Sequence, residues 1–310
     1  MLIAVCICTF RRPESLAATL RGLDRLAFQR IGPLELHVIV VDNEGSEATR
    51  AVAEDFADAG FALTYLVEPR RGISQARNAC LKHIPAEARY AAFLDDDLVP
   101  RPDWLEELVA AAEATGATAA TGPCFAAYDA TVPEWVRAGR FFASPRAKQP
   151  TNHGRIAFGV MGNILFDAVF LRRSGVRFKE RFGRIGGEDR RFFLDLFHKG
   201  AVFVWAERAI VDHHVETRRL TWAYIMRREF SVGYASAMLE RSEAPSWGQL
   251  AGYGLRTAAK LAFKIVLLAP AALLGALRHD AFRRVKPVLD IANLSGRLYG
   301  LSGRGYELYG

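Results

Sequence analysis

The sequence predicts an α/β fold in which a mostly parallel sheet is flanked by helices. Short apolar runs alternate with helix-forming stretches through the first half of the chain, as βαβ units require. Several apolar runs end abruptly in polar or charged residues, at the position where α/β proteins carry functional loops. A chain of 310 residues, 51% of them hydrophobic, is long enough for one large domain and an appendage.

The first half of the chain contains five predicted strands and the helices between them. The strands are short apolar runs, namely Leu2–Cys8, Leu36–Val41, Leu63–Val67, Tyr90–Leu94 and Ala117–Thr121. Pro13 suits the first turn of a helix, and Leu16, Leu20 and Leu23 then keep helical spacing. The other predicted helices are Ala48–Ala59, Ile73–His83 and Pro102–Ala114.

The second half of the chain is less regular. Residues Cys124–Arg155 lose periodicity and are rich in aromatics, Pro and Arg, so we expect a long loop or lid there. The elements expected after it are a strand over Phe158–Phe166, a loop over Phe178–Gly187, a helix from Glu188 to Gly200, short strands over Val202–Trp205 and Ala209–His213, and a helix over Leu220–Leu239.

The C-terminal part of the chain is apolar and basic. Leu261–Leu277 is apolar apart from one Lys, but its uninterrupted stretch is short for a membrane span and carries Pro270. Between Arg256 and Gly310, nine Lys or Arg stand against three Asp or Glu. Two interpretations stay open: a basic amphipathic segment on an anionic membrane surface, or a helical hairpin packed on the core or on a second subunit.

Charge and cysteine usage narrow the class of protein. A net charge of +7 and an isoelectric point near 9.4 fit a polyanionic partner: nucleic acid, nucleotide phosphates or an anionic membrane. The four cysteines form neither a CxxC pair nor a Cys/His cluster at zinc spacing, so we expect reduced core thiols in a cytoplasmic protein. The apolar N-terminus is short and lacks a basic start and a cleavage site, so a signal peptide is not expected.

The most informative feature is the run of carboxylates Asp95, Asp96 and Asp97, which directly follows the predicted strand Tyr90–Leu94. Adjacent carboxylates repel one another and lose hydration when half-buried, so a partner must offset that cost. A divalent cation with hard oxygen ligands is the natural candidate, and a solvated acidic loop is the alternative. The position at the carboxyl end of a buried parallel strand favours a metal or metal-phosphate site.

Five polar segments follow predicted strands, and a parallel sheet brings such segments to one edge. They are Cys8-Thr9-Phe10-Arg11-Arg12, Val41-Asp42-Asn43, Glu68-Pro69-Arg70-Arg71-Gly72, Asp95-Asp96-Asp97 and Gly122-Pro123. Together they offer Arg for phosphates, an Asp that can accept from a base N–H, and carboxylates for a metal. This is the chemistry of a nucleoside diphosphate held with a divalent ion. A basic edge without acidic ligands would instead suggest RNA, so no nucleic-acid partner is expected.

Five motifs carry a resemblance that extends over roughly residues 1–234. They are Thr9-Phe10-Arg11-Arg12-Pro13, Val40-Val41-Asp42-Asn43, Arg71-Gly72-Ile73-Ser74-Gln75-Ala76-Arg77-Asn78, Asp95-Asp96-Asp97 and Gly187-Glu188-Asp189. In this order and spacing the chain resembles a family 2 glycosyltransferase of the GT-A fold, in particular bacterial exopolysaccharide (succinoglycan-type) glucosyltransferases. The resemblance implies a Rossmann-like nucleotide-diphospho-sugar transferase fold and an enzyme that uses a UDP-sugar.

The resemblance also implies a domain organisation. We expect a glycosyltransferase domain over residues 1–244, with a nucleotide-binding half over 1–123 and an acceptor-binding half over 124–244. Residues 245–310 would form a C-terminal basic and apolar helical segment that associates with the membrane.

The resemblance assigns roles at the nucleotide edge. Thr9, Arg11 and Asp42 would line the uridine pocket, with Asp42 accepting from the uracil ring. Arg71 would lie near the nucleotide, and Arg77 and Asn78 would support the donor pocket.

The Asp triplet matches the DXD motif of the family. Asp95 and Asp97 occupy its two acidic positions, and Asp97 would be the direct ligand of Mg²⁺ or Mn²⁺. Asp96 stands at the variable middle position of the motif. It is expected among the donor-binding residues, and whether it also binds the metal stays open.

Glu188 and Asp189 form a second acidic site at a predicted helix start. The preceding glycines permit a tight turn, and simple N-terminal capping, which favours acidic residues by about 0.3–1 kcal/mol, is the alternative role. The resemblance implies that Asp189 is the general base of an inverting transfer, which takes the acceptor hydroxyl proton. Glu188 would orient it or bind the acceptor.

Several other residues have two open interpretations each. His213 or His214 could complete the metal site, but adjacent strand residues face opposite ways, so only one can point inward. Asn163 could contact donor or acceptor, or simply pack against a neighbouring backbone. The remaining candidates are Arg218 and Arg219, for diphosphate or solvent, and Trp135, Phe141 and Phe142, for sugar stacking or the core of the loop.

The predicted activity is therefore an inverting, metal-dependent hexosyl transfer in exopolysaccharide biosynthesis. The expected acceptor is a glycan or a polyprenyl-diphosphate-linked oligosaccharide at the inner face of the cell membrane, where the protein would be peripheral. A homodimer through the C-terminal helices is an alternative use of that segment.

Three rival functions are weaker. A catalytically reduced membrane-bound scaffold would not need the intact Asp97 and Asp189. A nucleotidyl cyclase is suggested by Gly186-Gly187-Glu188-Asp189, but Phe does not follow at the needed place. A nucleotide-sugar pyrophosphorylase needs a Gly-rich phosphate loop where Thr9-Phe10-Arg11-Arg12 stands.

Overall fold

The central strand of the sheet is apolar on both faces, and both faces are covered. In the computed structural model, β1 (Leu2–Thr9) lies between β2 (Glu35–Asp42) and β4 (Tyr90–Leu94) and is parallel to both. Its side chains alternate between two cores, with Val5 in one and Cys6 in the other. The structure describes residues 1–32, 34–128, 132–144, 151–183, 186–243, 246–268, 270 and 281–303.

Eight strands form the main sheet, in the order β3-β2-β1-β4-β9-β6-β10-β8. The strands not yet given are β3 (Ala62–Val67), β6 (Ala119–Thr121), β8 (Arg155–Ile156), β9 (Asn163–Asp167) and β10 (Phe203–Trp205). Strand β9 is antiparallel to β4 and β6, and β8 is antiparallel to β10. The other pairs are parallel, so the predicted mostly parallel sheet is confirmed.

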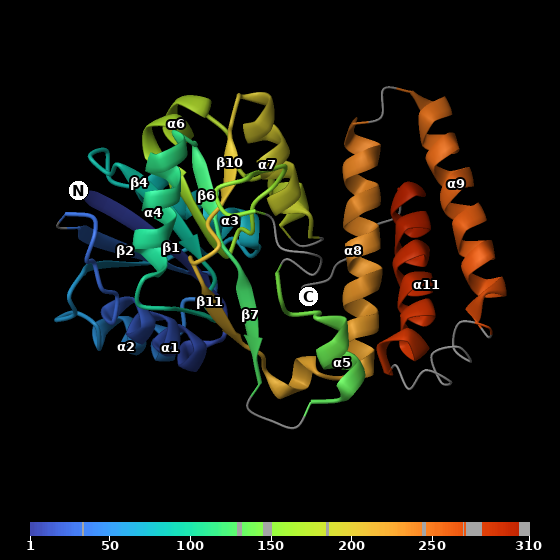
Figure 1. Cartoon of the computed structure of the whole chain (residues 1–310), viewed down its shortest axis with the longest axis horizontal. Helices are drawn as coiled ribbons and strands as arrows, with labels where there is room; N and C mark the ends of the chain where they lie inside the picture. The colour runs from blue at the N-terminus through green and yellow to red at the C-terminus, as the bar shows by residue number, and fades with distance from the viewer. Residues whose placement is uncertain are drawn as a thin grey trace. The chain divides into compact units, whose positions relative to one another are not determined.

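Helices cover the two faces of this sheet and make three layers. Helices α1 (Pro13–Asp24), α2 (Glu47–Glu54) and α4 (Trp104–Thr115) pack on one face, where α1 and α2 lie side by side (Figure 1). Helices α3 (Ile73–His83), α6 (Ala168–Ser174) and α7 (Glu188–His198) pack on the other. Each fully buried Leu, Ile or Val on these faces contributes roughly 1.5–3 kcal/mol, so the layers fix the strand ends that carry the site.

A second, three-stranded sheet extends the carboxyl edge. Strand β11 (Val211–His214) lies between β5 (Leu98–Pro100) and β7 (Cys124–Ala127). The register pairs His213 with Leu98. This pairing brings the end of β11 next to the Asp triplet.

The predicted elements are confirmed where they are long and regular. Helix α3 and strand β4 have the predicted ends, and helix α8 (Trp222–Glu243) covers the predicted Leu220–Leu239 within a few residues. The prediction of a long loop or lid after residue 123 was partly wrong, because this region contains strand β7 and helix α5 (Glu134–Gly139). Residues before Asn163 form a turn, not the predicted start of a strand, with the Asn163 amide donating to Val160 O at 2.8 Å.

Chain contacts divide the molecule into two compact units. The first comprises residues 1–127, 142–180 and 188–214, and the second comprises residues 128–141, 181–187 and 215–310. Helix α8 therefore belongs with the C-terminal helices, although the sequence grouped its residues with the transferase domain. The functional boundaries at residues 123 and 244 stay predictions.

The second unit contains three long helices that run beside one another. Helix α11 (Ala281–Leu301) lies between α8 and α9 (Trp247–Val266) (Figure 1). A Cβ on Gly296 would stand 2.0 Å from Phe230 O, so α8 and α11 cross in direct backbone contact. Lys264 of α9 pairs with Asp290 of α11 at 2.7 Å. Among the helices that the structure describes, none has the length and apolar character needed to span a membrane.

Candidate active site

Three predicted site segments meet at the carboxyl edge of the main sheet. Thr9 at the end of β1 pairs in register with Asp42 at the end of β2. The Asp triplet follows β4, the other neighbour of β1. The predicted convergence of these loops on one edge is confirmed.

The three carboxylates of the triplet point to different partners. Asp96 accepts from Thr9 Oγ1 at 2.8 Å and from Arg12 Nη1 at 3.2 Å. Asp97 accepts from the same Arg12 nitrogen at 3.1 Å. Asp95 lies 3.5 Å from Arg77 Nη2 and keeps 46% of its side chain exposed. Mutual repulsion is thus reduced by two guanidinium groups.

Asp96 has a structural role that the sequence did not reveal. It is 5% exposed, and its backbone oxygen also accepts from Thr19 on α1 at 3.0 Å. Burial raises the pKa of Asp96, Arg12 opposes this, and the adjacent Asp97 adds to it. Asp96 therefore ties the turn after β4 to β1 and α1. In this geometry the Thr9 hydroxyl is committed to Asp96.

Glycine at position 162 leaves room for the carboxylate of Asp95 next to the backbone of the turn before β9. A Cβ there would lie 2.3 Å from Asp95 Oδ2, and the Asp95 amide is 3.4 Å from Gly162 O. The turn before β9 thus approaches the triplet more closely than any side chain permits.

His213 and Asp97 are the pair best placed for a metal. His213 Nδ1 donates to Phe142 O at 3.3 Å, which leaves Nε2 directed at Asp97 Oδ2, 3.5 Å away. This Nε2 is buried and has no hydrogen-bond partner among the described residues. A buried acceptor nitrogen beside a carboxylate fits a divalent ion, with the Phe142 carbonyl orienting the ring. The described residues contain no group of three or more His, Cys, Asp or Glu side chains arranged around one metal position.

His214 does not share this position. It is exposed, as expected for the neighbour of an inward-facing strand residue. The strand register turns His213 inward and His214 outward, which favours His213 as the ligand, and the metal role of either histidine stays a prediction.

Arg77 links the triplet to the second acidic site. Its buried guanidinium lies against Asp95, donates to Glu188 Oε1 at 3.0 Å and donates to Asp189. Burial acts to lower the pKa of Arg77, but the charges of Asp189, Glu188 and Asp95 outweigh it and raise that pKa. One permanent cation is therefore shared by three carboxylates. Removing it would leave them uncompensated.

Asp189 is reachable from solvent, whereas Glu188 is buried. The pair opens α7 directly after Gly187, whose φ of 88° permits the predicted tight turn. Asp189 keeps 38% of its side chain exposed. Desolvation raises the pKa of Asp189, Arg77 lowers it, and Glu188 raises it, with a net upward shift. A carboxylate of raised pKa at a reachable position is suited to accept a proton.

Asp42 is enclosed at the end of β2. Its carboxylate accepts from Glu44 N at 2.8 Å, Ser46 N at 3.0 Å and Tyr65 OH at 2.8 Å. The side chain is fully buried, and three of its acceptor positions are used by the protein itself. Its predicted contact with the base stays a prediction.

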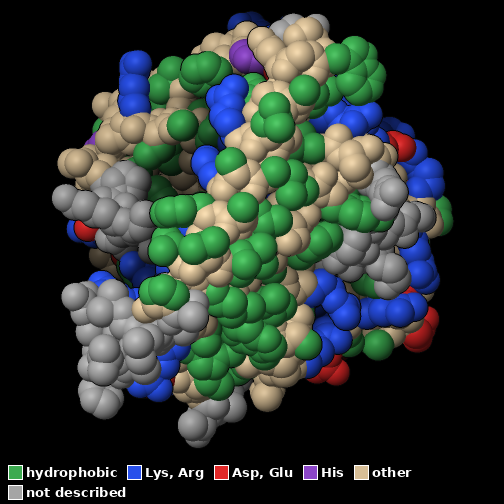
Figure 2. Space-filling model, turned by 90° about the vertical axis from the view of Figure 1, so that its right-hand side faces the viewer, with side chains coloured by type: hydrophobic (Ala, Val, Ile, Leu, Met, Phe, Trp, Pro, Cys, Tyr) green, Lys and Arg blue, Asp and Glu red, His purple; other side chains and the backbone are tan. Residues whose placement is uncertain are grey.

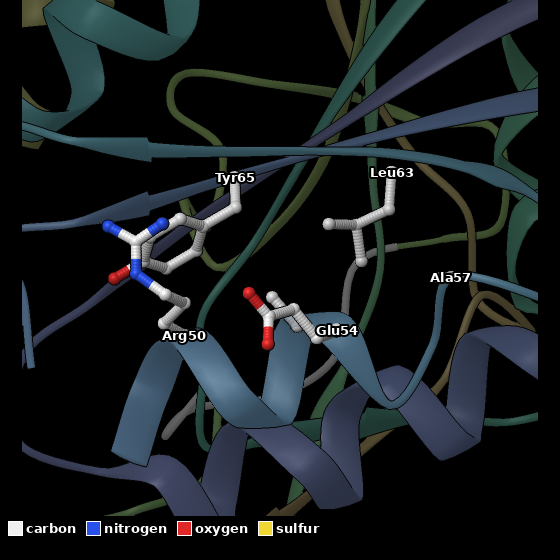
Figure 3. Close-up of a pocket in the computed structure, with 6 residues that line it drawn as sticks. Arg50, Glu54, Ala57, Leu63 and Tyr65 are labelled. Carbon is white, nitrogen blue, oxygen red and sulfur yellow. The ribbon is translucent and has the colours of Figure 1, made fainter. Parts of the chain in front are cut away.

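A hollow of about 310 Å³ lies on the other side of Tyr65, between α2 and β3. Its lining residues are Arg50, Ala53, Glu54, Ala57, Leu63 and Tyr65. Figure 3 shows Arg50 alongside the ring of Tyr65, with the guanidinium 5.1 Å from the ring centroid. None of these residues belongs to the predicted site. The hollow borders the site through Tyr65, whose hydroxyl donates to Asp42 at 2.8 Å.

Two predicted arginines lie close to the ring of Phe10 at the nucleotide edge. The guanidinium of Arg11 lies 5.0 Å from the centroid of Phe10, and that of Arg71 lies 5.5 Å from it. Arg11 has a φ of 58° and pairs with Glu44 at 2.5 Å. Both arginines are exposed, so they remain available to phosphates.

Asn163 is a core residue, which favours its packing interpretation over the expected contact with donor or acceptor. It is 0% exposed, and its amide oxygen accepts from Trp104 Nε1 at 2.7 Å. Its amide nitrogen donates to Pro123 O at 3.0 Å and Ala209 O at 2.8 Å. The side chain therefore joins segments of the scaffold. Asn78 likewise exchanges two hydrogen bonds with the backbone of Phe178.

The aromatics of the central segment belong to the protein interior. Phe142 is buried against the His213 ring, and Phe141 is buried between Trp135 and Phe282. This confirms the packing interpretation for the two Phe residues. In the second unit, Arg218 and Arg219 contact Glu216.

Sequence reasoning gave no role to Arg12 or Tyr65. Arg12 holds Asp96 and Asp97, and Tyr65 holds Asp42. The only signal for Arg12 was its place directly after a strand end. Tyr65 lies inside a strand, where nothing local distinguishes it from a packing residue.

Comparison with known proteins shows which protein family contains this sheet edge. The model of the family described as "Glycosyl transferase family 2" matches residues 4–174, more than half of the chain. The chain belongs to glycosyl transferase family 2. As a family 2 glycosyltransferase it is an enzyme, and the matched region contains the triplet, Arg77 and the ends of β1 and β2.

Two curated relatives match this glycosyltransferase over most of their length. The succinoglycan biosynthesis protein ExoM of Rhizobium meliloti is 34% identical over 99% of this chain and 96% of its own. The glucosyl-dolichyl phosphate glucuronosyltransferase of Haloferax volcanii is 34% identical over 77% of this chain and 78% of its own.

Solved glycosyltransferases share the fold. The mannosyltransferase PcManGT from Pyrobaculum calidifontis, in complex with GDP-Man and Mn²⁺, has a TM-score of 0.64 and 16% identity, over 98% of this chain and 88% of that one. TarS 1-349 from S. aureus, in complex with UDP, has a TM-score of 0.55 and 16% identity, over 99% and 93%. The predicted GT-A fold is therefore confirmed.

Proposed function

We propose that this family 2 glycosyltransferase transfers a sugar from a UDP-sugar to a glycan or lipid-linked oligosaccharide with inversion of the anomeric centre. The observation that carries the proposal is the position of Arg77, which contacts Asp95 on the donor side and Asp189 on the acceptor side. The residues proposed to bind the donor and the residue proposed to accept the proton therefore contact the same guanidinium group.

Asp189 acts as the general base in this proposal. It takes the proton of the acceptor hydroxyl while that oxygen attacks the anomeric carbon. Its partial exposure and raised pKa support this role. Arg77 keeps the carboxylate in place, and Glu188 fixes Arg77 from the buried side.

The donor is held at the edge formed by β1, β2 and β4. In this proposal Thr9, Arg11 and Asp42 line the base pocket, and Arg71 lies near the nucleotide, with both guanidinium groups close to the ring of Phe10. Asp97 and His213, which face each other, would hold a divalent ion, Mg²⁺ or Mn²⁺, and Asp95 would supply the other acidic position of the motif. When bound, such an ion stabilises the leaving diphosphate.

The relatives and the charge of the chain support a proposal for the acceptor and the location. One relative acts in succinoglycan biosynthesis, and another is named for a dolichyl-phosphate-linked substrate. We infer a polyprenyl-diphosphate-linked acceptor in exopolysaccharide synthesis. The enzyme would work as a peripheral protein at the inner face of the cell membrane, and a homodimer is the alternative use of the C-terminal helices.

Isothermal titration with UDP, with and without Mn²⁺, tests the proposal. We expect binding that depends on the metal, followed by UDP release when the correct UDP-sugar is supplied from a donor panel. UDP binding without any turnover across the panel would favour the catalytically reduced scaffold. No metal-dependent UDP binding at all would overturn the assignment of the site.

A further inference from the structure

Helix α9 presents a long apolar face to solvent. Its large exposed hydrophobic side chains keep between 54% and 79% of their surface accessible, and they are Trp247, Leu255, Phe263, Ile265 and Val266. Along the described length of the helix, Thr257 is the one buried residue. Isolated exposed hydrophobics are ordinary, but a row of this kind on one helix marks a contact surface.

The exposed residues form one stripe along the helix. Trp247, Ala251, Leu255 and Ala259 recur every fourth residue, and Ala262, Phe263 and Val266 continue the same face. Lys264 lies on the opposite side, where it pairs with Asp290 of α11. Figure 2 shows the corresponding face of the molecule, with hydrophobic side chains gathered into a patch and Lys and Arg at its margins.

A basic edge runs beside this stripe. Arg256 and Lys260 are exposed and lie one turn apart, flanking Leu255 and Ala259. The helix thus combines an apolar face with cations at its border. This is the pattern of a helix that lies in the plane of a membrane surface, where cations meet anionic headgroups.

We propose that α9 is an in-plane membrane anchor that inserts its apolar stripe into the headgroup region of an anionic bilayer. The inference rests on the proposed membrane location and names the element responsible for it. An anionic bilayer accounts for the stripe and for the basic edge together. A second copy of the chain would bury the stripe, but in an antiparallel pair it would also bring two basic edges together.

Vesicle flotation of the full chain tests this proposal. We expect binding to phosphatidylcholine vesicles that contain roughly one third phosphatidylglycerol, and much weaker binding to phosphatidylcholine alone. Leu255→Asp should weaken binding about tenfold or more, because a carboxylate replaces an inserted apolar side chain. Phe197→Asp is the matched control, since Phe197 is an exposed hydrophobic residue on α7, and it should leave binding unchanged.

The basic edge is tested separately. Arg256→Gln and Lys260→Gln should each weaken binding to anionic vesicles about fivefold and reduce its sensitivity to salt. Both changes should leave the weak binding to neutral vesicles as it was.

Other outcomes would overturn the inference. These are no vesicle binding by the wild type, equal losses for Leu255→Asp and Phe197→Asp, or a dimer without vesicles that Leu255→Asp dissociates. The last result would assign the stripe to contact between copies. UDP titration of the same preparations separates the proposals: vesicle binding without UDP binding overturns only the reaction, and the reverse result overturns only the anchor.

Discussion

Arg77 stands 3.5 Å from Asp95 and thereby connects helix α3 to the end of strand β4. Because the same guanidinium holds Glu188 and Asp189, α7 is joined to the same point. Asp95 and the pair Glu188-Asp189, which lie far apart in the chain, therefore share a single buried cation.

Replacing Arg77 by a neutral residue of similar length should destabilise the fold. Arg77→Met leaves three carboxylates without their cation, and we expect a loss of about 3–5 kcal/mol in the free energy of unfolding. Arg70→Met is the matched control, since that Arg is exposed and pairs with Glu68 and Glu180 at the surface. The control should change stability by about 0–1 kcal/mol. Urea denaturation measures both, and similar losses would contradict the proposed role of Arg77.

Asp189→Asn should abolish turnover while preserving donor binding. Loss of a general base typically lowers kcat by about a hundredfold to ten-thousandfold. UDP affinity should stay within a few-fold, because the proposed function assigns Asp189 to the acceptor and not to the donor. Asp195→Asn on the same helix serves as control, as Asp195 pairs with Arg191 at 2.8 Å. Normal turnover by Asp189→Asn would place the base elsewhere.

The pH dependence of turnover should follow the raised pKa of Asp189. The base works only when ionised, so kcat/KM should fall as pH is lowered through this pKa, at a higher pH than for an ordinary Asp. Burial is the main cause, and repulsion from Glu188 contributes. Glu188→Gln removes that repulsion and should move the acidic limb to lower pH. A shift to higher pH in this variant would contradict the electrostatic account.

The two adjacent histidines should differ in their effect on metal-dependent binding. His213→Ala removes the nitrogen that faces Asp97, and we expect Mn²⁺-dependent UDP affinity to fall about tenfold or more. His214→Ala, at an exposed position, should leave it unchanged. Titration of UDP at several Mn²⁺ concentrations compares the two. Equal effects would show that the strand register does not select one ligand.

Asp96 and Asp97 should separate stability from metal binding. Asp96→Asn weakens the contacts to Thr9 and Arg12, with an expected cost of about 1–3 kcal/mol in unfolding free energy. Its effect on Mn²⁺-dependent UDP binding should be small. Asp97→Asn should have the larger effect on Mn²⁺-dependent UDP binding and the smaller effect on the free energy of unfolding. Loss of metal dependence in Asp96→Asn at unchanged stability would make Asp96 a ligand after all.

Local patterns were sufficient for the long elements. The boundaries of α3 and β4 follow from uninterrupted periodicity, and the position of the triplet follows from the end of β4. The short elements β7 and α5 were missed because a few residues form a strand or helix only when a partner element is present. Residues Phe158–Met161 have the composition of a strand, but the chain forms a turn before Asn163. At this turn Gly162 permits the backbone to approach Asp95 closely.

Side-chain partners were the part that the sequence could not predict. The hydrogen bond from Thr9 to Asp96 joins residues 87 positions apart, and no local pattern encodes it. The choice between His213 and His214 required the pairing of β11 with β5. Asn163 has the polarity of a ligand-binding residue, but its partners come from α4 and two loops. Polarity at a strand start therefore did not distinguish a buried bridge from a binding contact.

The carboxylate run after β4 also bears on the order in which ligands arrive. Arg12 and Arg77 act as counter-ions for Asp95, Asp96 and Asp97, so the charge of the triplet is partly balanced by the chain itself. If this edge holds a divalent ion, the same carboxylate oxygens that pair with Arg12 and Arg77 would have to bind it. The negative charge of a nucleoside diphosphate would favour the ion over the guanidinium groups at those oxygens. Ion and nucleotide should therefore enter as one complex and leave together, so that the edge of the sheet is reset after each turnover.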